Sequence, residues 1–157
     1  MIGAYWLQHH YSGRIYRKSD HWFGALNLRF LLAIVVIPYP LRAWCLHLGT
    51  PFEATGAVTL VAGLALTACT WMCKWFYGMS GGRRVMDKRL ARDFLHQMTR
   101  RYGIATLIQI GAVPVVIAAP RVGVAIALLC AAFFLLPQPK PRYKPGQEPS
   151  AEEKTKE

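Results

Sequence analysis

The sequence predicts an all-α polytopic membrane protein with four transmembrane helices, an N-terminal helix stub and a cytoplasmic amphipathic helix. Apolar residues make up 54% of the 157 positions and gather in long runs bounded by helix-capping or helix-breaking residues. The 19 Lys and Arg residues outnumber the 8 Asp and Glu residues, which gives a net charge of +11, and most of them lie between these runs. This segregation indicates spanning helices, and the apolar content excludes a disordered chain.

The first span is expected at residues 22–41. Its central part, residues 30–37, is an unbroken apolar run, FLLAIVVI. Asn27 and Arg29 stand near its start, where a polar side chain should face protein or, for arginine, reach the headgroups. We expect Asn27 to make an interhelical hydrogen bond. The Pro-Tyr-Pro sequence beginning at Pro38 should bend or end the helix.

The second span is expected at residues 54–77 and has the clearest signal. Thr50, Pro51 and Glu53 form a capping box in which Thr50 caps, Pro51 opens the helix and Glu53 reaches back. No charged residue follows until Lys74, near the far end of the span. An aromatic cluster at that end is typical of a membrane interface and contains Trp71, Trp75, Phe76 and Tyr77.

A basic segment, residues 79–103, follows the second span and carries seven Lys or Arg residues against two Asp residues. Apolar side chains recur in it every four residues, at Met86, Leu90, Phe94 and Met98. This spacing predicts an amphipathic helix lying along the headgroups. Anionic lipid explains the charge better than nucleic acid does, because the segment is flanked by spans. The basic side chains expected to face the headgroups are Arg83, Arg84, Lys88, Arg89 and Arg92.

The third and fourth spans are expected at residues 102–119 and 120–136, as a hairpin through the membrane. Pro120 and Arg121 interrupt the apolar sequence and form a short turn, while Pro114 is expected to kink the third span. Residues 1–136 would then form the transmembrane domain. The rest of the chain, residues 137–157, holds five prolines and nearly balanced charges, so we expect a disordered tail.

The charge distribution predicts the orientation of the protein. The segment before the first span, residues 79–103 and the tail are basic, whereas the two opposite loops carry few charges. The positive-inside rule therefore places both termini and residues 79–103 in the cytoplasm. Residues 1–8 are moderately apolar but too few to span a bilayer, and we expect them to be the last turns of a helix.

Few residues suggest chemistry, so we expect neither an enzyme nor a cofactor or metal site. No nucleophile elbow, zinc-binding His-Glu-x-x-His or phosphate-binding glycine loop occurs. Cys69 and Cys73 are four positions apart without a nearby His or carboxylate, so packing is favoured over metal binding. The adjacent His9 and His10 could bind a metal or relay protons, but a hydrogen-bonded pair at a helix end is the simpler interpretation.

Small polar residues recur on one face of the second span, at Thr59, Gly63 and Thr67. Their spacing of four positions puts them on the same side of a helix. Such a stripe could line a polar path, or it could let two helices approach closely. Close packing is the favoured interpretation, and the polar path stays open as the alternative.

The order of short motifs resembles the transmembrane protein 175 family, the endosomal and lysosomal potassium channels and their bacterial relatives. The resemblance is carried by the sequence WLQHH at residues 6–10, NLRFL at residues 27–31 and PYP at residues 38–40. The turn at residues 119–121 and a last helix closed by Pro137 resemble the end of that family. The resemblance implies potassium transport, a homo-oligomer (a tetramer in bacterial members), and a bacterial cytoplasmic membrane with both ends cytosolic.

One signature of that family does not occur in this sequence. The family's first helix carries a Phe-Ser-Asp motif and lines the pore, and the resemblance implies that Trp6, His9 and Asn27 hydrogen-bond to it. No such motif is present, and Lys18-Ser19-Asp20 lies in the wrong place to replace it. We therefore expect a potassium-channel relative that is shortened at its start or completed by another chain. The alternative is a non-conducting four-span protein with a structural or interaction role.

Overall fold

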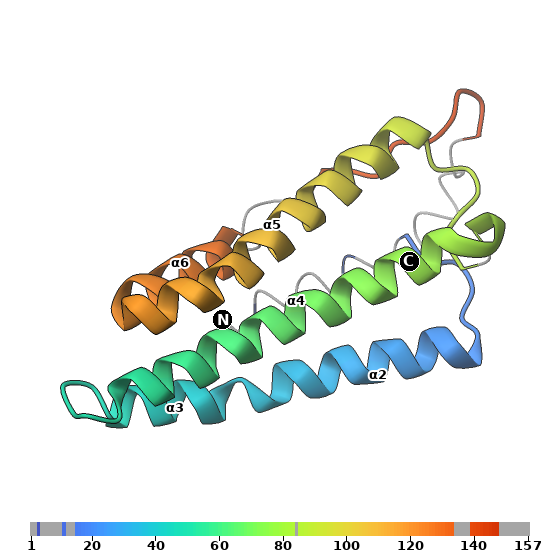
Figure 1. Ribbon diagram of the computed structural model, residues 1–157. Coiled ribbons are helices and arrows are strands. Elements are labelled where there is room, and N and C mark those ends of the chain that lie inside the picture. The colour runs from blue at the N-terminus through green and yellow to red at the C-terminus, as the bar shows by residue number, and fades with distance from the viewer. Residues whose placement is uncertain (1–2, 4–10, 12–14, 84, 134–138, 148–157) are drawn as a thin grey trace.

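The computed structural model describes residues 3, 11, 15–83, 85–133 and 139–147, and it shows a bundle of α-helices (Figure 1). In chain order the helices are α2 (His21–Val36), α3 (Pro38–Leu46), α4 (Glu53–Arg83), α5 (Arg92–Ala118) and α6 (Pro120–Phe133). The all-α prediction is therefore confirmed. Residues 1–8, the expected N-terminal stub, lie outside the described residues except for residue 3, and so do Trp6 and His9.

Three of the four predicted spans are long and apolar enough to cross a membrane. These candidate spans are His21–Leu46, Glu53–Ser80 and Arg92–Ala118. The fourth predicted span corresponds to α6, which has 14 residues in the described part of the chain. At about 1.5 Å per residue it extends about 21 Å, less than the roughly 30 Å thickness of a bilayer core. The structure thus supports three spans and a shorter apolar helix.

The first span continues beyond the expected bend. The side chain of Asp20 caps α2 by accepting a hydrogen bond from the backbone N–H of Phe23 at 2.8 Å. Ile37, at the junction with α3, has helical backbone angles, and Leu41 N–H donates to its carbonyl. Because proline is tolerated in the first turn of a helix, Pro38 begins α3 almost directly after α2.

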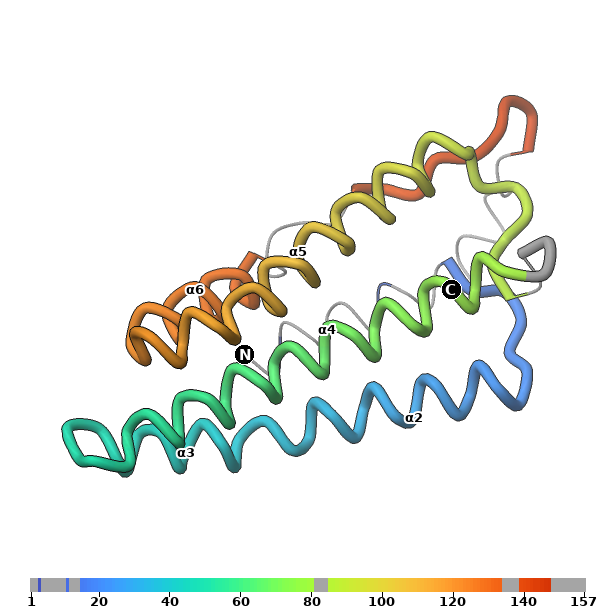
Figure 2. The backbone as a smooth tube through the Cα atoms, in the orientation of Figure 1, coloured from blue at the N-terminus to red at the C-terminus, as the bar shows by residue number. Residues whose placement is uncertain are grey.

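The central element of the bundle is α4, which packs against all the other described helices. Figure 2 shows α2 and α3 running along one side of α4, with α5 and α6 on the other. In the most apolar part of α4, 61% of the residues are buried. The corresponding share is 17% in the α2–α3 span and 28% in α5. Both flanking spans therefore leave most of their apolar side chains available to lipid or to another protein.

Two glycines permit close approach of neighbouring helices. A Cβ atom at Gly123 would lie 2.5 Å from Cα and Cβ of Val116, so α5 and α6 touch at this point. A Cβ atom at Gly56 would lie 2.9 Å from Cα of Trp44, where α3 meets α4. The short hairpin predicted between α5 and α6 is present and depends on the small residue at Gly123.

The capping box of α4 is shifted relative to the prediction. Glu53 is the first residue of α4, and its Oε2 accepts from the N–H of Gly49 at 2.8 Å instead of from Thr50. The Thr50 hydroxyl oxygen accepts from the N–H of Phe52 at 3.3 Å. Gly49 has a φ of +75°, which glycine adopts readily and which brings its N–H within reach of the carboxylate.

The predicted amphipathic surface helix over residues 79–103 does not form as a separate element, because residues 92–103 are the first turns of α5. Instead α4 extends to Arg83, α5 begins at Arg92, and the described residues between them are extended or in turns. The four apolar residues spaced every four positions are 2% exposed or less: Met86, Leu90, Phe94 and Met98. All four side chains belong to the hydrophobic core, where they are close-packed among other buried side chains. Pro114 lies inside the continuous α5.

Three basic segments meet at one end of the bundle. Tyr16 pairs with Met86, and Leu90 pairs with Tyr143, as isolated antiparallel bridges. This end, which we call the basic end, therefore gathers residues 15–20, 85–92 and 139–147. The positive-inside prediction requires these segments to lie on the same side of the membrane. All three lie at the same end of the bundle, which that prediction requires. Which side of a membrane they face stays a prediction.

Part of the tail, residues 139–147, lies against the bundle. The N–H of Ala91 donates to the carbonyl of Arg142 at 2.8 Å, and the N–H of Lys144 donates to the carbonyl of Arg89 at 2.9 Å. The guanidinium of Arg89 also lies over the Tyr143 ring, 5.9 Å from its centroid. These two backbone hydrogen bonds hold a short segment of the tail against residues 89–91.

Candidate functional site

A buried lysine is the most unusual residue of the described chain. Lys74 of α4 is only 1% exposed. Its Nζ donates a hydrogen bond to Oδ1 of Asn27 on α2, at 3.1 Å. A buried ammonium group is costly unless polar or aromatic partners replace water around it. Lys74 and Asn27 are therefore the starting point for the candidate site.

Aromatic rings surround the ammonium group. Its Nζ lies 4.4 Å from the ring centroid of Trp71, which is the shortest of four such distances. The negative faces of aromatic rings attract a cation at these distances, most strongly where water is excluded. We call these rings the aromatic cage: Trp71, Phe30 at 5.3 Å, Tyr16 at 5.6 Å and Phe23 at 5.7 Å.

The cage continues into a stack of rings that joins α2, α4 and α5. Phe30 contacts Trp71 with centroids 4.9 Å apart, and Trp71 contacts Tyr102 at 5.5 Å. Trp75 also packs on Tyr102, at 4.9 Å, and its Nε1 donates to Oγ1 of Thr99 at 2.9 Å. Tilted and edge-on ring contacts of this kind stabilise a core beyond simple burial. The stack fixes the position of the cage relative to α5.

The prediction of an interfacial aromatic belt is wrong for two of its members. Trp71 is 5% exposed and Trp75 is 1% exposed, so both face the protein interior. Phe76 is 53% exposed and is the member that faces outward. The physical reason is the helical period, because only one side of α4 can face outward once Lys74 and the stack occupy the other.

Polar groups surround the cage on the side of the basic end. Oδ2 of Asp20 accepts a hydrogen bond from the Tyr77 hydroxyl at 2.9 Å while Oδ1 caps α2. The Tyr16 hydroxyl is buried without a hydrogen-bond partner among the described residues. Burial raises the pKa of Tyr16 above its ordinary value. The Tyr16 phenol therefore stays neutral and can donate.

Sequence reasoning found Asn27 but missed Lys74. The interhelical hydrogen bond expected of Asn27 is present, and Lys74 is its donor. We treated Lys74 as the mark of the end of a span, yet an ionisable residue within a span is itself a signal of a special site. The burial of Lys74 could not be predicted from the sequence, because the four rings around it come from three parts of the chain: the segment before α2, α2 itself and α4.

The threonines of α4 do not form a shared buried stripe. Thr59 is exposed and its hydroxyl donates to the carbonyl of Thr55 at 2.8 Å. Thr67 is fully buried and its hydroxyl donates to the carbonyl of Gly63 at 2.9 Å. Each hydroxyl thus donates to its own helix, as threonines in apolar helices commonly do.

The expected headgroup-facing residues divide into two groups. Lys88 and Arg92 are exposed at the basic end, as expected. Arg89 instead turns inward, with Nε 3.2 Å from Oδ2 of the buried Asp87, which Arg17 also approaches at 3.4 Å. A buried carboxylate needs such partners. Arg84, and the side chain of Arg83, lie outside the described part of the chain.

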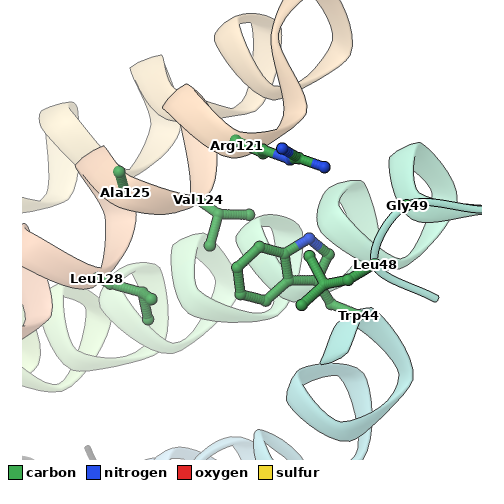
Figure 3. Close-up of a pocket in the computed structure, with 7 residues that line it drawn as sticks. All are labelled: Trp44, Leu48, Gly49, Arg121, Val124, Ala125 and Leu128. Atoms are coloured by element: carbon green, nitrogen blue, oxygen red, sulfur yellow. The ribbon is translucent and has the colours of Figure 1, made fainter. Parts of the chain in front are cut away.

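A cavity of about 590 Å³ lies at the opposite end of the bundle. Figure 3 shows Trp44 and Leu48, from α3 and the loop after it, facing Arg121 and Val124 of α6. Arg121 bonds to both carboxylate oxygens of Glu53, at 2.7 and 3.1 Å, which ties the start of α4 to the start of α6. The Trp44 Nε1 is buried without a hydrogen-bond partner among the described residues.

A second buried polar side chain joins α5 to α6. The Gln109 Nε2 donates to the carbonyl of Ala127 at 3.0 Å, and Gln109 is 1% exposed. Its Oε1 is buried without a partner within the described residues. This hydrogen bond holds the hairpin together in an apolar environment.

No metal-binding cluster of three or more His, Cys, Asp or Glu side chains occurs among the residues that the structure describes. Cys69 is half-buried and Cys73 is exposed, and both are free thiols.

Comparisons with known protein families, curated proteins and solved structures find no match for this chain.

Proposed function

We propose that this chain is an integral membrane subunit of a potassium-transport assembly, as its resemblance to the transmembrane protein 175 family implies. The geometric support is the arrangement of three candidate spans with α4 in the centre and two flanking spans largely uncovered. Apolar faces of that extent need lipid or neighbouring subunits. The choice of potassium comes from the sequence resemblance.

In this proposal the ions pass between copies of the chain instead of through the described bundle. Lys74 places a buried amino group beside Asn27, between α2 and α4. A protonated Lys74 would repel a cation that moved through the same interior. The rings of the cage and the stack also fill that interior. Exposed faces of the flanking spans are free to line a path between subunits.

Potassium flux into liposomes tests the proposal. The purified chain is reconstituted at several protein-to-lipid ratios, its oligomeric state is measured by cross-linking, and flux is followed with an ion-selective electrode. Protein-free vesicles and vesicles loaded with sodium are the controls. The proposal expects flux that rises with oligomer content. An oligomer that gives no more flux than empty vesicles would contradict independent conduction.

The second candidate function is that of a non-conducting membrane protein with a structural or interaction role. The observation that favours it is the bonding of Thr59 and Thr67, whose hydroxyls donate to their own helix. Permeation needs fixed ligands or a lined constriction, and hydroxyls committed to the backbone are poorer ligands. Oligomers without flux, stable in lipid, would support this second function.

A further inference from the structure

A groove between α5 and α6 opens near the polar first turns of α5, which begins at the basic end. Its volume is about 540 Å³, within the range of about 300–1,000 Å³ that is typical of small-molecule sites. Its lining combines polar side chains with apolar ones, including Gln97, Arg100, Arg101, Ile104, Ile108 and Phe133.

The lining changes character along α5. Gln97, Arg100 and Arg101 are polar and come first in the helix, whereas Ile104 and Ile108 follow about one and two turns deeper. Both isoleucines are more than two-fifths exposed, at 48% and 42%. The groove therefore has a cationic entrance and an apolar floor, which together match an amphiphilic ligand.

The cationic entrance lies where the apolar part of the hairpin ends. Arg101 is stacked on Phe133, the last described residue of α6, with Cζ 4.7 Å from the ring centroid. From Tyr102 onward α5 carries no charged residue, up to its end at Ala118. Arginine at such a boundary places its guanidinium at the depth of lipid phosphates.

The guanidinium of Arg101 has capacity for a ligand. Its Nε is buried and has no hydrogen-bond partner among the described residues. The Phe133 ring lies against the guanidinium, which keeps its N–H groups as donors for a planar anion. A guanidinium binds phosphate through parallel hydrogen bonds, and such charge-assisted bonds are stronger than neutral ones. Arg100 adds a second positive charge at the same entrance.

We propose that this groove binds one anionic phospholipid, with Arg100 and Arg101 on its phosphate and Ile104 and Ile108 along an acyl chain. The charge at the entrance fits a negative headgroup, and the apolar floor fits hydrocarbon. The basic end matches the cytoplasmic leaflet, whose anionic lipids bind basic pockets between helices. The proposal depends on membrane insertion and is independent of potassium transport.

Native mass spectrometry of the full chain in neutral detergent tests this site. The probes are phosphatidylglycerol, phosphatidylcholine with the same acyl chains, and inorganic phosphate. We expect at least about 10-fold tighter binding of phosphatidylglycerol than of phosphatidylcholine, the order that charge-assisted hydrogen bonds produce. Arg101→Gln should remove most of this preference. Arg92→Gln is the matched control, because Arg92 is exposed on the same helix but outside the groove.

Ile104→Trp provides a second variant that keeps the charge and fills the apolar floor. It should weaken binding of both phospholipids, and circular dichroism with size-exclusion chromatography verifies that each variant is folded. Equal losses in Arg101→Gln and Arg92→Gln would show diffuse attraction and overturn the proposal. Unchanged binding in Ile104→Trp, or inorganic phosphate displacing phosphatidylglycerol at similar concentration, would also overturn it.

Discussion

The ammonium group of Lys74 lies 3.1 Å from Oδ1 of Asn27, and the two residues belong to different spans. Asn27 is half-buried on α2, whereas Lys74 is almost completely buried on α4. The hydrogen bond satisfies an amide oxygen and a charged donor at once, and the aromatic cage replaces much of the hydration that the ammonium group loses. This relationship links the packing of two candidate spans to a single buried charge.

Removing either partner of this hydrogen bond should destabilise the protein. Lys74→Met loses the charge while keeping similar volume, and Asn27→Leu leaves the ammonium group without its acceptor. We expect a loss of about 1–3 kcal/mol in the free energy of unfolding for Asn27→Leu, because a buried donor loses its amide acceptor. The measurement is unfolding by sodium dodecyl sulfate in mixed micelles, followed by circular dichroism.

The double variant separates the hydrogen bond from general packing effects. Combining Lys74→Met with Asn27→Leu should give a coupling energy of about 1–2 kcal/mol, as contacting buried residues show. Lys88→Met, an exposed lysine at the basic end, is the control and should have little effect. Additive single effects, with no coupling, would contradict the assigned partnership.

Substitution of Gly123 should disrupt the hairpin between α5 and α6. A Cβ atom there would lie 2.5 Å from Cα of Val116, so backbone must move. We expect Gly123→Ala to cost about 1–3 kcal/mol, as overpacked cores do. Gly111→Ala is the matched control, since nothing lies within 4 Å of its Cβ, and it should be neutral or stabilise by up to about 1 kcal/mol. The same unfolding assay applies, and equal effects would refute the close contact.

The ordered tail predicts a specific effect at Ala91. Its φ is −65°, which proline adopts without strain, so Ala91→Pro removes the N–H that donates to Arg142 without disturbing the start of α5. Tryptic cleavage after Arg142 should become about 2–10-fold faster, the factor that one backbone hydrogen bond supplies. Ala91→Ser keeps the N–H and serves as the control. Identical cleavage rates in both variants would argue against docking of the tail.

Labelling of single cysteines tests the predicted orientation. In a variant with the four natural cysteines replaced by serine, Lys88→Cys reports on the basic end and His47→Cys on the opposite loop; both positions are exposed. A membrane-impermeant maleimide should label His47→Cys in intact cells and Lys88→Cys only after permeabilisation, as the positive-inside rule requires. The reverse pattern would invert the orientation.

The predictions that rest on contacts between neighbouring residues agree with the structure more closely than those that rest on distant contacts. Glu53 accepts a backbone hydrogen bond at the start of α4, one residue away from the predicted partner, and the long uncharged run of α4 is helical as expected. Where the prediction failed, distant contacts decided the outcome. Met86 and Leu90 recur at a helical spacing, yet they lie in extended backbone because Tyr16 and Tyr143 pair with them.

The sequence by itself determined the helical class and three of the four predicted apolar spans, and it predicted that the basic segments gather at one end, because hydropathy and charge act along the chain. Tertiary structure alone decided which side chains meet. It buried Lys74 among rings from several segments, brought Arg17 to Asp87, and placed Arg101 against Phe133 at a groove. Those outcomes depend on the angles and distances at which α2, α5 and α6 pack around α4. No periodicity along one chain encodes these distances, since each arises from contacts between residues far apart in sequence.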